Sequence, residues 1–525
     1  MSGRGRIVGI DLGTTNSCLA TYSEGGARLV ATAAGQRTTP STVAFLPDGR
    51  ILVGTAARRQ AVTNPRNTVT AVKRLIGRRF DSPEITVMRD VYPFEIARSP
   101  NGDAWVRAQD RLVSPSEIQS HVIEKLKDAA ESELGESVNR AVITVPAYFD
   151  EAQRQATRDS TTIAGLQVVR ILNEPTAAAL AYGLHRSQGR RIAVVDLGGG
   201  TFDVTVLIVE DGVFEVLATA GDMLLGGEDF DRRIAMLLRE EIHAAHGIDV
   251  FGDQVAMQRI LEEAEAAKRA LSESTEAILG LPFLAMSPNG QPVSVHRTLD
   301  RAEFDGITKD LVDRLIEPCR IALADAGLQA NEIENVLLVG GMTRVPAVQT
   351  CFSRLFGVRP SKGVNPDEAV AIGAAVETAI LEGTLTDVVL VDVVPHTIGI
   401  RAAGDRLAAV IKRSTPVPTR IRKVFATTED DQSQVTVEVY QGENPVASKN
   451  RLLARLVLTD IPPGRKGEIH VEVTFSLDAS GLLSIAAREM ATGKPTTATV
   501  KPISGLDRNA VERLAAERQA AARKI

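Results

Sequence analysis

Short apolar runs alternate with helical patterns over the first 384 residues of the chain. Four of these runs have the continuous aliphatic character of buried strands, at residues 6–10, 141–147, 191–197 and 335–341. Between them the pattern predicts helices, among them one over 114–135. There Ser114 is the expected N-cap, Pro115 opens the first turn, and Glu117 would complete a capping box. This alternation predicts an α/β architecture.

The pattern changes near residue 385, where the hydrophobic period shortens to two. Segments 434–443 and 469–489 alternate apolar and polar positions, and the second contains the turn DASG, which predicts a hairpin. We therefore expect an all-β sandwich over 395–505. The stretch that follows predicts a helix with Asp507 at its start.

Composition excludes several classes of function. The chain of 525 residues carries a net charge of −6, and only 4% of its residues are aromatic, which argues against a nucleic-acid partner. No stretch resembles a signal peptide or a membrane span, so a cytoplasmic protein without membrane contact is expected. Three scattered cysteines make a disulfide framework or a zinc site a poor explanation.

Two similar sequence motifs occur where two of the predicted strands end: DLGTTNS at 11–17 and DLGGGTFD at 196–203. Glycines let a backbone approach a ligand closely, and successive N–H groups in such a turn form an anion-binding concavity. Hydroxyls and carboxylates accompany the glycines at Thr14, Thr15, Thr201, Asp11, Asp196 and Asp203. Two such turns could clamp a phosphate chain and its divalent cation. Each turn alone is equally explained as a tight β-hairpin, and no P-loop motif occurs.

A third glycine-rich turn, LVGGMTRVP at 338–346, also follows a predicted strand. In the predicted helix 260–274, four polar residues share one face because they are three or four positions apart: Glu265, Lys268, Arg269 and Ser272. A solvated charged face is the ordinary explanation of that pattern. Together with the three turns it could instead hold an adenine and a ribose.

Seven ordered motifs, collinear with the chain from about residue 6 to its end, resemble the heat shock protein 70 family, bacterial DnaK type. They are VGIDLGTTNSC, AVITVPAYF, ILNEPTAAALAYGL, DLGGGTFDV, LLGGEDFD, LVGGMTR and NPDEAVAIGAA. The resemblance implies an actin-like ATPase domain of two duplicated lobes, a β-sandwich peptide-binding domain and a short C-terminal helix. The implied bounds are 1–384 for the ATPase domain, 385–394 for a linker, 395–505 for the sandwich and 506–525 for the start of a shortened helical lid.

The resemblance also assigns residues to roles in binding and hydrolysing ATP. The residues implied in hydrolysis are Lys73, Glu174, Asp196 and Thr201. Those implied in nucleotide binding are Thr14, Thr15, Gly198, Gly199, Gly200, Glu265, Lys268, Arg269, Ser272, Gly341, Arg344 and Asp367. Asp11 and Asp203 would organise Mg²⁺, with K⁺ expected beside it. By themselves, Lys73 could equally be a surface lysine and Glu174 a first-turn acid favoured by the helix dipole.

A further set of implied roles couples ATP to the second domain. In the ATP state the segment 387–393 is expected to dock onto the ATPase domain, although its pattern equally fits an ordinary edge strand. Relay and co-chaperone positions are Pro146, Arg170, Asn173 and Asp392. The expected partners are unfolded polypeptides, a J-domain co-chaperone, and a GrpE-type nucleotide exchange factor that opens the lobe containing 224–231.

The sandwich is expected to hold an extended apolar peptide. Pocket positions implied by the resemblance are Ile400, Phe425, Val435 and Val437, all equally explained as sandwich core. Ala403 and Thr428 take the two positions that arch over the peptide, and both depart from the common bacterial residues. The resemblance implies a longer helical lid than the one helix found here. Because most of the lid is missing, peptide release is expected to be fast.

Other functions remain open at this stage. An actin-fold small-molecule kinase or a filament protein would not need residues 385–525. A regulatory or exchange-factor-like relative, or a chaperone dedicated to iron–sulfur cluster assembly, would share every motif above.

Overall fold

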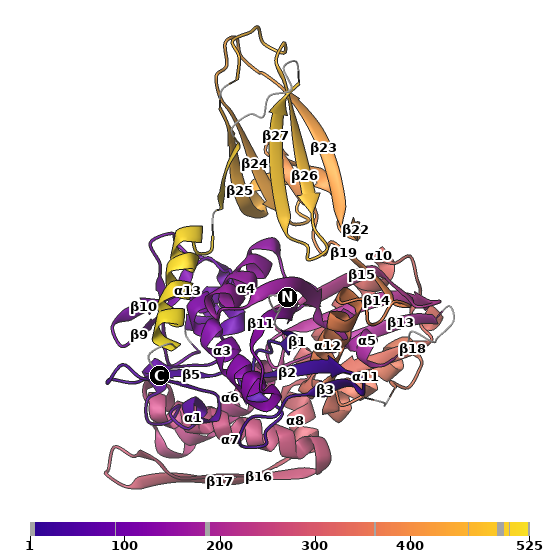
Figure 1. The fold of residues 1–525 in the computed structure, drawn as a ribbon. Helices are drawn as coiled ribbons and strands as arrows, with labels where there is room; N and C mark the ends of the chain where they lie inside the picture. The colour runs from indigo at the N-terminus through magenta and orange to yellow at the C-terminus, as the bar shows by residue number, and fades with distance from the viewer. Residues whose placement is uncertain are drawn as a thin grey trace.

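The computed structural model describes residues 6–89, 91–183, 190–361, 364–459, 461–490, 498–502 and 504–522. A broad α/β body carries a narrow β sandwich at one end (Figure 1). The last three residues of the predicted C-terminal helix, 523–525, lie outside the described part. None of the described helices is long and apolar enough to cross a membrane.

The first sheet of the body has the strand order β12-β11-β1-β2-β3, with β4 paired to β2. Its strands are β1 (Arg6–Asp11), β2 (Asn16–Ser23), β3 (Gly26–Leu29), β4 (Thr39–Pro40), β11 (Val138–Val145) and β12 (Gln167–Asn173). After the antiparallel meander β1-β2-β3, the chain returns so that β11 lies parallel to β1. The predicted strands at 6–10 and 141–147 are confirmed, the second displaced by two to three residues.

The second sheet repeats this plan in the order β18-β13-β14-β15-β19-β22. Its strands are β13 (Arg190–Leu197), β14 (Phe202–Glu210), β15 (Val213–Asp222), β18 (Asn335–Val339), β19 (Val389–Val393) and β22 (Pro416–Val417). The meander β13-β14-β15 is again followed by a parallel return, β18 beside β13. A parallel bridge from Leu337 to Ser361 stands where β12 stands in the first sheet. We call residues 6–183 the first lobe and 190–361 the second lobe.

Two helices each pack on the sheet that they do not follow in the sequence. Helix α5 (Glu174–Ala181) follows the first sheet but packs on β13 and β14, whereas α12 (Ala369–Leu381) follows the second sheet and packs on β1 and β2. A Cβ on Gly373 of α12 would lie 1.7 Å from the carbonyl oxygen of Ala177, so the two helices approach through glycine. This crossing fixes the two sheets to each other.

Further helices and small sheets surround this centre. The other long helices are α3 (Pro115–Leu134), α4 (Glu151–Ile163), α6 (Gly227–His246), α7 (Gln254–Glu273), α10 (Ile316–Asp325) and α11 (Pro346–Phe356). The short helices are α1 (Thr55–Arg58), α2 (Pro83–Arg89), α8 (Arg301–Ile307) and α9 (Lys309–Arg314). The outer strands are β5 (Val43–Phe45), β6 (Ile51–Val53), β7 (Thr68–Val69), β8 (Glu95–Arg98), β9 (Ala104–Ala108), β10 (Arg111–Val113), β16 (Glu276–Met286) and β17 (Pro292–Asp300).

The predicted helix over 114–135 is α3. Ser114 caps it, since its side chain accepts a hydrogen bond from the backbone N–H of Glu117 at 3.1 Å. The Glu117 carboxylate lies 3.5 Å from Arg111. Within this described helix the reciprocal bond of the expected capping box is not formed.

The sandwich consists of a sheet in the order β21-β20-β24-β25-β28 packed on a sheet in the order β23-β26-β27. Its strands are β20 (Ile398–Ala402), β21 (Arg406–Ile411), β23 (Thr419–Ala426), β24 (Val435–Gln441), β25 (Arg451–Leu458), β26 (His470–Leu477), β27 (Leu483–Glu489) and β28 (Ala498–Pro502). Fully buried Val439, Leu456 and Phe475 form its centre. The predicted strand at 434–443 and the predicted hairpin at 469–489 are both confirmed.

Two segments join the sandwich to the body. Strand β19 lies parallel to β15 and antiparallel to β22, so the second sheet continues into the sandwich end of the molecule. The last helix, α13 (Arg508–Ala522), packs beside α3 and α4 and away from the sandwich strands (Figure 1). Arg518 of α13 forms an ion pair with Glu124 of α3 at 2.9 Å.

Candidate active site

A cleft of about 1750 Å³ opens between the two lobes. Sixteen of the predicted residues line it: Asp11, Thr14, Thr15, Lys73, Glu174, Asp196, Gly198, Gly199, Thr201, Glu265, Lys268, Arg269, Ser272, Gly341, Arg344 and Asp367. Gly200 and Asp203 are buried beside the cleft and do not line it. Residues from five distant parts of the sequence therefore meet around one space.

The two glycine-rich turns connect β1 to β2 and β13 to β14, and both border the cleft. A Cβ on Gly199 would lie 1.9 Å from the hydroxyl oxygen of Thr15, so the turns are in direct contact. A Cβ on Gly13 would lie 2.0 Å from the carbonyl oxygen of Asn16, which explains glycine inside the first turn. Each turn joins two antiparallel strands, which confirms the hairpin expected from its sequence. Both hairpins also border the same cleft.

Lys73 and Glu174 form a buried ion pair in this cleft. The Nζ of Lys73 lies 2.5 Å from the Oε1 of Glu174, and their side chains are 4% and 9% exposed. Lys73 lies in the 3-10 helix η2 (Val72–Arg74), whereas Glu174 opens α5 directly after its N-cap, Asn173. The description of Lys73 as a surface lysine is therefore wrong.

Three more carboxylates surround this pair. The pKa of Asp11 is raised to about 7, first by burial and then by the charge of Glu174. Burial followed by Glu174 also raises the pKa of Asp203 to about 7, and the pKa of Asp196 is raised for the same two reasons. The carboxylates outnumber the lysine, so full ionisation of the cluster needs additional positive charge.

The cluster has the character of a cation site that works through water or phosphate oxygens. The backbone N–H of Tyr148 binds one oxygen of Asp203 at 2.9 Å, while the other oxygen is buried without a hydrogen-bond partner. Within the described residues, no three His, Cys, Asp or Glu side chains are arranged to hold a metal ion by themselves. The residues thus fit a hydrated divalent cation that is bound together with phosphate.

The family comparison agrees with this geometry. A family model described as Hsp70 protein matches residues 7–524. The chain belongs to the heat shock protein 70 family. Members of this family are ATPases and act as ATP-dependent chaperones, and their architecture joins an actin-like ATPase domain to a β sandwich.

One end of the Hsp70 cleft is built by α7 and the third glycine-rich turn. Lys268 is 7% exposed; its Nζ donates to the carbonyl of Gly227 at 3.0 Å and to Asp231 at 2.8 Å. Arg344 donates to Asp367 at 2.8 Å. Lys268 is therefore buried and hydrogen-bonded, so the explanation of its helix face as solvated and charged fails at this residue.

Two residues that border this end were missed from the sequence. Arg58 of α1 forms an ion pair with Glu265 across the cleft, and Asp231 of α6 accepts from Lys268. Asp231 belongs to the LLGGEDFD motif, which could have suggested it. Arg58 carries no such signal, because its partner is 207 positions away.

The six residues predicted to contact peptide lie in the sandwich. Val437 belongs to the buried core, and three others pack against that core while partly exposed: Ile400, Phe425 and Val435. Ala403 and Thr428 are exposed, in the loops that follow β20 and β23. Both a core role and a contact with peptide remain compatible with these positions.

Three of the four predicted relay and co-chaperone residues lie near β19. Asp392 of β19 accepts from the Thr176 hydroxyl at 3.3 Å and also hydrogen-bonds Asn173. Asn173 in turn accepts from Arg154 of α4 at 2.6 Å, a buried arginine that the sequence did not single out. Arg170 pairs with Glu377 of α12 at 2.7 Å. Pro146 is buried directly after β11, next to Val145, which pairs with Asn173 in the sheet.

Proposed function

We propose that this protein is an ATP-driven chaperone in which ATP hydrolysis in the cleft switches the grip of the sandwich on an unfolded polypeptide. The observation that carries the proposal is the second sheet. It runs without interruption from the β13–β14 turn at the cleft, through β15 and β19, to β22 at the base of the sandwich. A shift of the turn on nucleotide binding therefore has a direct mechanical route to the peptide domain.

Within the cleft, the proposed roles follow from charge and position. Lys73 balances the charge that develops on the terminal phosphate, while Glu174 and Asp196 orient the attacking water. Thr201 donates its hydroxyl to a phosphate oxygen. The glycine-rich turns hold the phosphate chain, and Glu265, Lys268, Arg269, Ser272, Gly341, Arg344 and Asp367 hold the adenosine.

Asp11 and Asp203 are proposed to organise Mg²⁺ through its waters, with K⁺ as a second counter-ion. When bound, Mg²⁺ would neutralise phosphate charge. The raised pKa values of Asp11 and Asp203 and the unpartnered oxygen of Asp203 support this assignment.

The proposed division of the chain is an ATPase domain over 1–384, a linker over 385–394, a peptide-binding sandwich over 395–505 and a lid segment from 506. Contacts from Ile400, Phe425, Val435 and Val437 would form the pocket for one aliphatic side chain, with Ala403 and Thr428 arching over the peptide. The partly exposed apolar surface of three of these residues supports that role.

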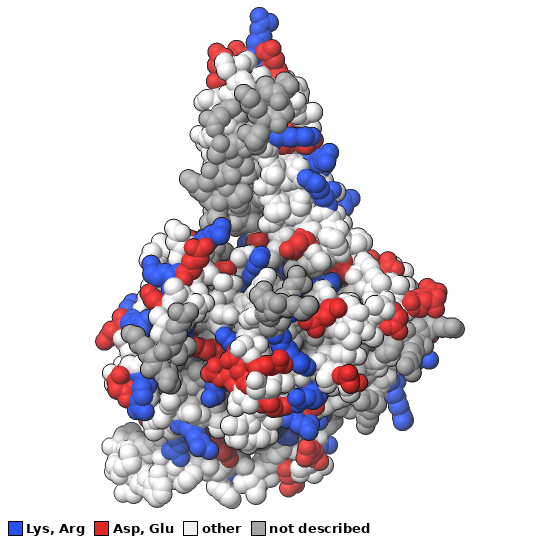
Figure 2. Space-filling model, in the orientation of Figure 1, with Lys and Arg blue, Asp and Glu red and all other residues white. Residues whose placement is uncertain are grey.

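We further propose a DnaK-type, cytoplasmic chaperone that works with a J-domain partner near Arg170, Asn173 and Asp392 and with a GrpE-type exchange factor at the second lobe. Pro146 would relay the state of the cleft to these surfaces. Basic and acidic side chains are interspersed over the face of the body in Figure 2, which gives no support for a nucleic-acid partner.

Single-turnover ATP hydrolysis tests the proposal, measured with and without an unfolded leucine-rich peptide and a J-domain protein. We expect a low basal rate that both additions raise, together with faster peptide release when ATP is bound. The variant Asp392→Ala should keep basal hydrolysis but lose the stimulation by peptide. Hydrolysis that ignores both additions, with peptide release indifferent to ATP, would instead indicate a regulatory relative.

A further inference from the structure

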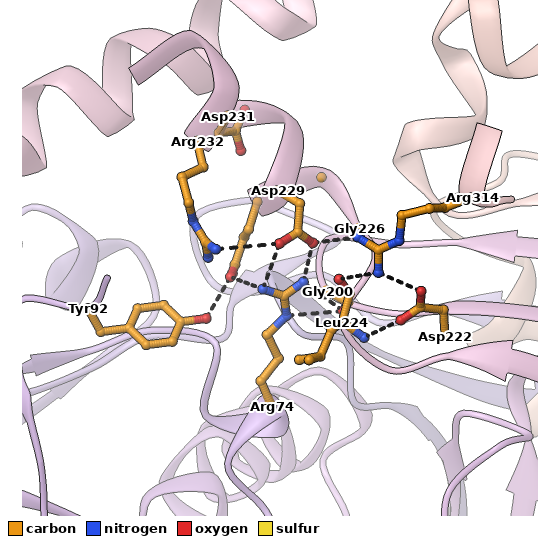
Figure 3. A network of polar contacts seen from close by, with 12 residues as sticks. Arg74, Tyr92, Gly200, Asp222, Leu224, Gly226, Asp229, Asp231, Arg232 and Arg314 are labelled. Atoms are coloured by element: carbon orange, nitrogen blue, oxygen red, sulfur yellow. Dashed lines mark hydrogen bonds and ion pairs between the residues drawn. The ribbon is translucent and has the colours of Figure 1, made fainter. Parts of the chain in front are cut away.

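The residue after Lys73 is a buried arginine to which the mechanism above gives no role. The Arg74 side chain is 1% exposed and points out of the first lobe toward the second (Figure 3). Burial of a guanidinium is costly unless all its donors are used, so its partners show what the position is for.

Arg74 binds the second glycine-rich turn and the start of α6 together. Its Nε and one terminal nitrogen donate to the carbonyl oxygen of Gly200 at 3.0 and 2.9 Å. The guanidinium also forms an ion pair with Asp229, and Glu228 lies 3.5 Å away. Asp229 accepts in addition from the backbone N–H of Gly226 at 2.8 Å, which ties the loop before α6 into the same network.

Three successive carbonyls of the turn are held by hydrogen bonds from outside the turn. Gly198 accepts from the N–H of Gly227 at 3.0 Å, and Gly199 accepts from the N–H of Glu228 at 2.8 Å. Gly200, the third, accepts from Arg74. In a trans peptide the N–H of the next residue points opposite to the carbonyl. Anchoring the carbonyls therefore places the N–H groups of residues 199–201 on the opposite side of the backbone, where they can form an anion-binding concavity.

The three anchors differ in origin. Gly227 and Glu228 belong to α6 and move with the second lobe, whereas Arg74 belongs to η2 in the first lobe. A Cβ on Gly200 would lie 2.8 Å from the Nε of Arg74, so this contact leaves no room for any other residue. Separation of the lobes would release the third carbonyl and leave the other two held.

We propose that Arg74 is a positioning residue that completes the phosphate-binding turn only when the lobes are closed, and so links lobe closure to affinity for the phosphate chain. The inference deepens the proposed ATPase function and rests on it. It requires that loss of Arg74 weakens the binding of the phosphates and leaves the binding of adenosine unchanged, because the adenosine residues lie in the second lobe and the segment after it.

The test compares the affinities of Arg74→Gln and Arg74→Lys for ATP, ADP and adenosine with those of the wild type. For Arg74→Gln we expect roughly 10-fold weaker binding of ATP and ADP, as for a lost hydrogen bond from a charged donor, with adenosine binding unchanged. ADP release should accelerate by a similar factor. Arg74→Lys keeps the charge but not the two-pronged donor, so it should show a smaller loss with the same selectivity.

The control is Arg232→Gln, which removes another arginine 3.8 Å from Asp229 that has no contact with Gly200 among the bonds described here. It should bind all three ligands as the wild type does. Equal losses for adenosine and ATP in the Arg74 variants would overturn the inference, because they indicate general loosening. If Arg74→Gln fails to fold, the inference rests on Arg74→Lys. A ratio of ATP affinity to adenosine affinity equal to that of the wild type in Arg74→Lys would then also overturn it. Failure of the wild type to bind ATP would refute the proposed function itself.

Discussion

At the scale of single residues, Lys73 shows why position in the fold decides chemistry. Its ammonium is buried against the carboxylate of Glu174. The charges of Asp11 and Asp196 also interact with the ammonium and with each other. A buried pair of this kind contributes little to stability, because desolvation of both ions offsets most of their attraction. Its position in a cleft bordered by two glycine-rich turns is the reason for proposing a catalytic role.

We predict that Lys73→Ala slows single-turnover hydrolysis of ATP by roughly 10²- to 10³-fold, since a charge aimed at the developing phosphate charge is lost. ATP affinity should fall much less, because the turns and the residues proposed to hold adenosine remain. Rapid-quench kinetics and equilibrium binding separate the two effects. Lys309→Ala removes an exposed lysine that pairs with Asp313 in α9 and serves as the control. Equal losses in rate and affinity would argue against a catalytic role.

Gly199 gives a second prediction at this scale. In Gly199→Ala the new methyl group would lie 1.9 Å from the Thr15 hydroxyl, so the two turns must separate. Overpacking of this size costs about 1–3 kcal/mol, and we expect ATP affinity to fall roughly 10-fold while the fold persists. The matched control is Gly280→Ala in β16, where a Cβ would meet nothing within 4 Å. ATP affinity equal to that of the control would show that the turns need not touch.

At the scale of elements, the sequence predicted those parts whose signal is local. Strands β1, β13 and β18 follow from continuous apolar runs, and the N-cap at Ser114 follows from its neighbours. The contacts of Arg58 with Glu265 and of Arg74 with Gly200 could not be predicted. Each joins positions more than 100 residues apart, and nothing in the local pattern marks Arg74 as buried.

The N-terminus of α4 carries a prediction about pH, because it meets the sandwich. The backbone N–H of Glu151 donates to the Gln441 side chain of β24 at 3.1 Å. The pKa of the Glu151 carboxyl is raised to about 7, first by burial at this joint and then by Asp150, while Arg451 opposes the shift. The docked arrangement therefore holds a proton that an exposed glutamate would release near pH 4.5.

The sign of the effect follows from that proton. Docking is fully supported below about pH 4.5 and weakens as pH rises toward 7, because the docked form binds the proton more tightly. We predict that the docked fraction, measured by energy transfer between dyes on the sandwich and the first lobe, falls between about pH 4.5 and pH 7. Glu151→Gln should flatten this dependence, whereas Glu136→Gln, at an exposed ion pair with Arg6, should retain it. A profile unchanged by Glu151→Gln would contradict the prediction.

At the scale of the whole molecule, the structure has the sandwich docked on the body and α13 packed on the first lobe. The resemblance predicted that 387–393 would dock in one state of the cycle, and β19 is docked beside β15. The hydrophobic pattern alone could not distinguish this strand from an ordinary edge strand. It also gave no sign that α13 would contact α4, because an amphipathic helix can pack on any apolar face.

The docked arrangement depends on ion pairs that cross between the sandwich and the body, which makes it testable by charge exchange. Arg413, between β21 and β22, pairs with Asp325 at the end of α10 at 2.7 Å. The pair is partly exposed, so a contribution of roughly 1 kcal/mol is expected, equivalent to about a 5-fold change in the docked-to-undocked ratio. Arg413→Asp and Asp325→Arg should each lower the docked-to-undocked ratio by more than about 5-fold, because each variant places two like charges together.

The double variant restores an opposite-charge pair in reversed orientation, and it should recover docking to near the wild-type level. Energy transfer between the sandwich and the body reports the docked fraction, and peptide-stimulated hydrolysis reports whether coupling returns with it. Basal hydrolysis should stay constant across the series, because neither residue of the pair lines the cleft. Recovery of docking without recovery of stimulation would show that the docked sheet is not the route by which the two domains communicate.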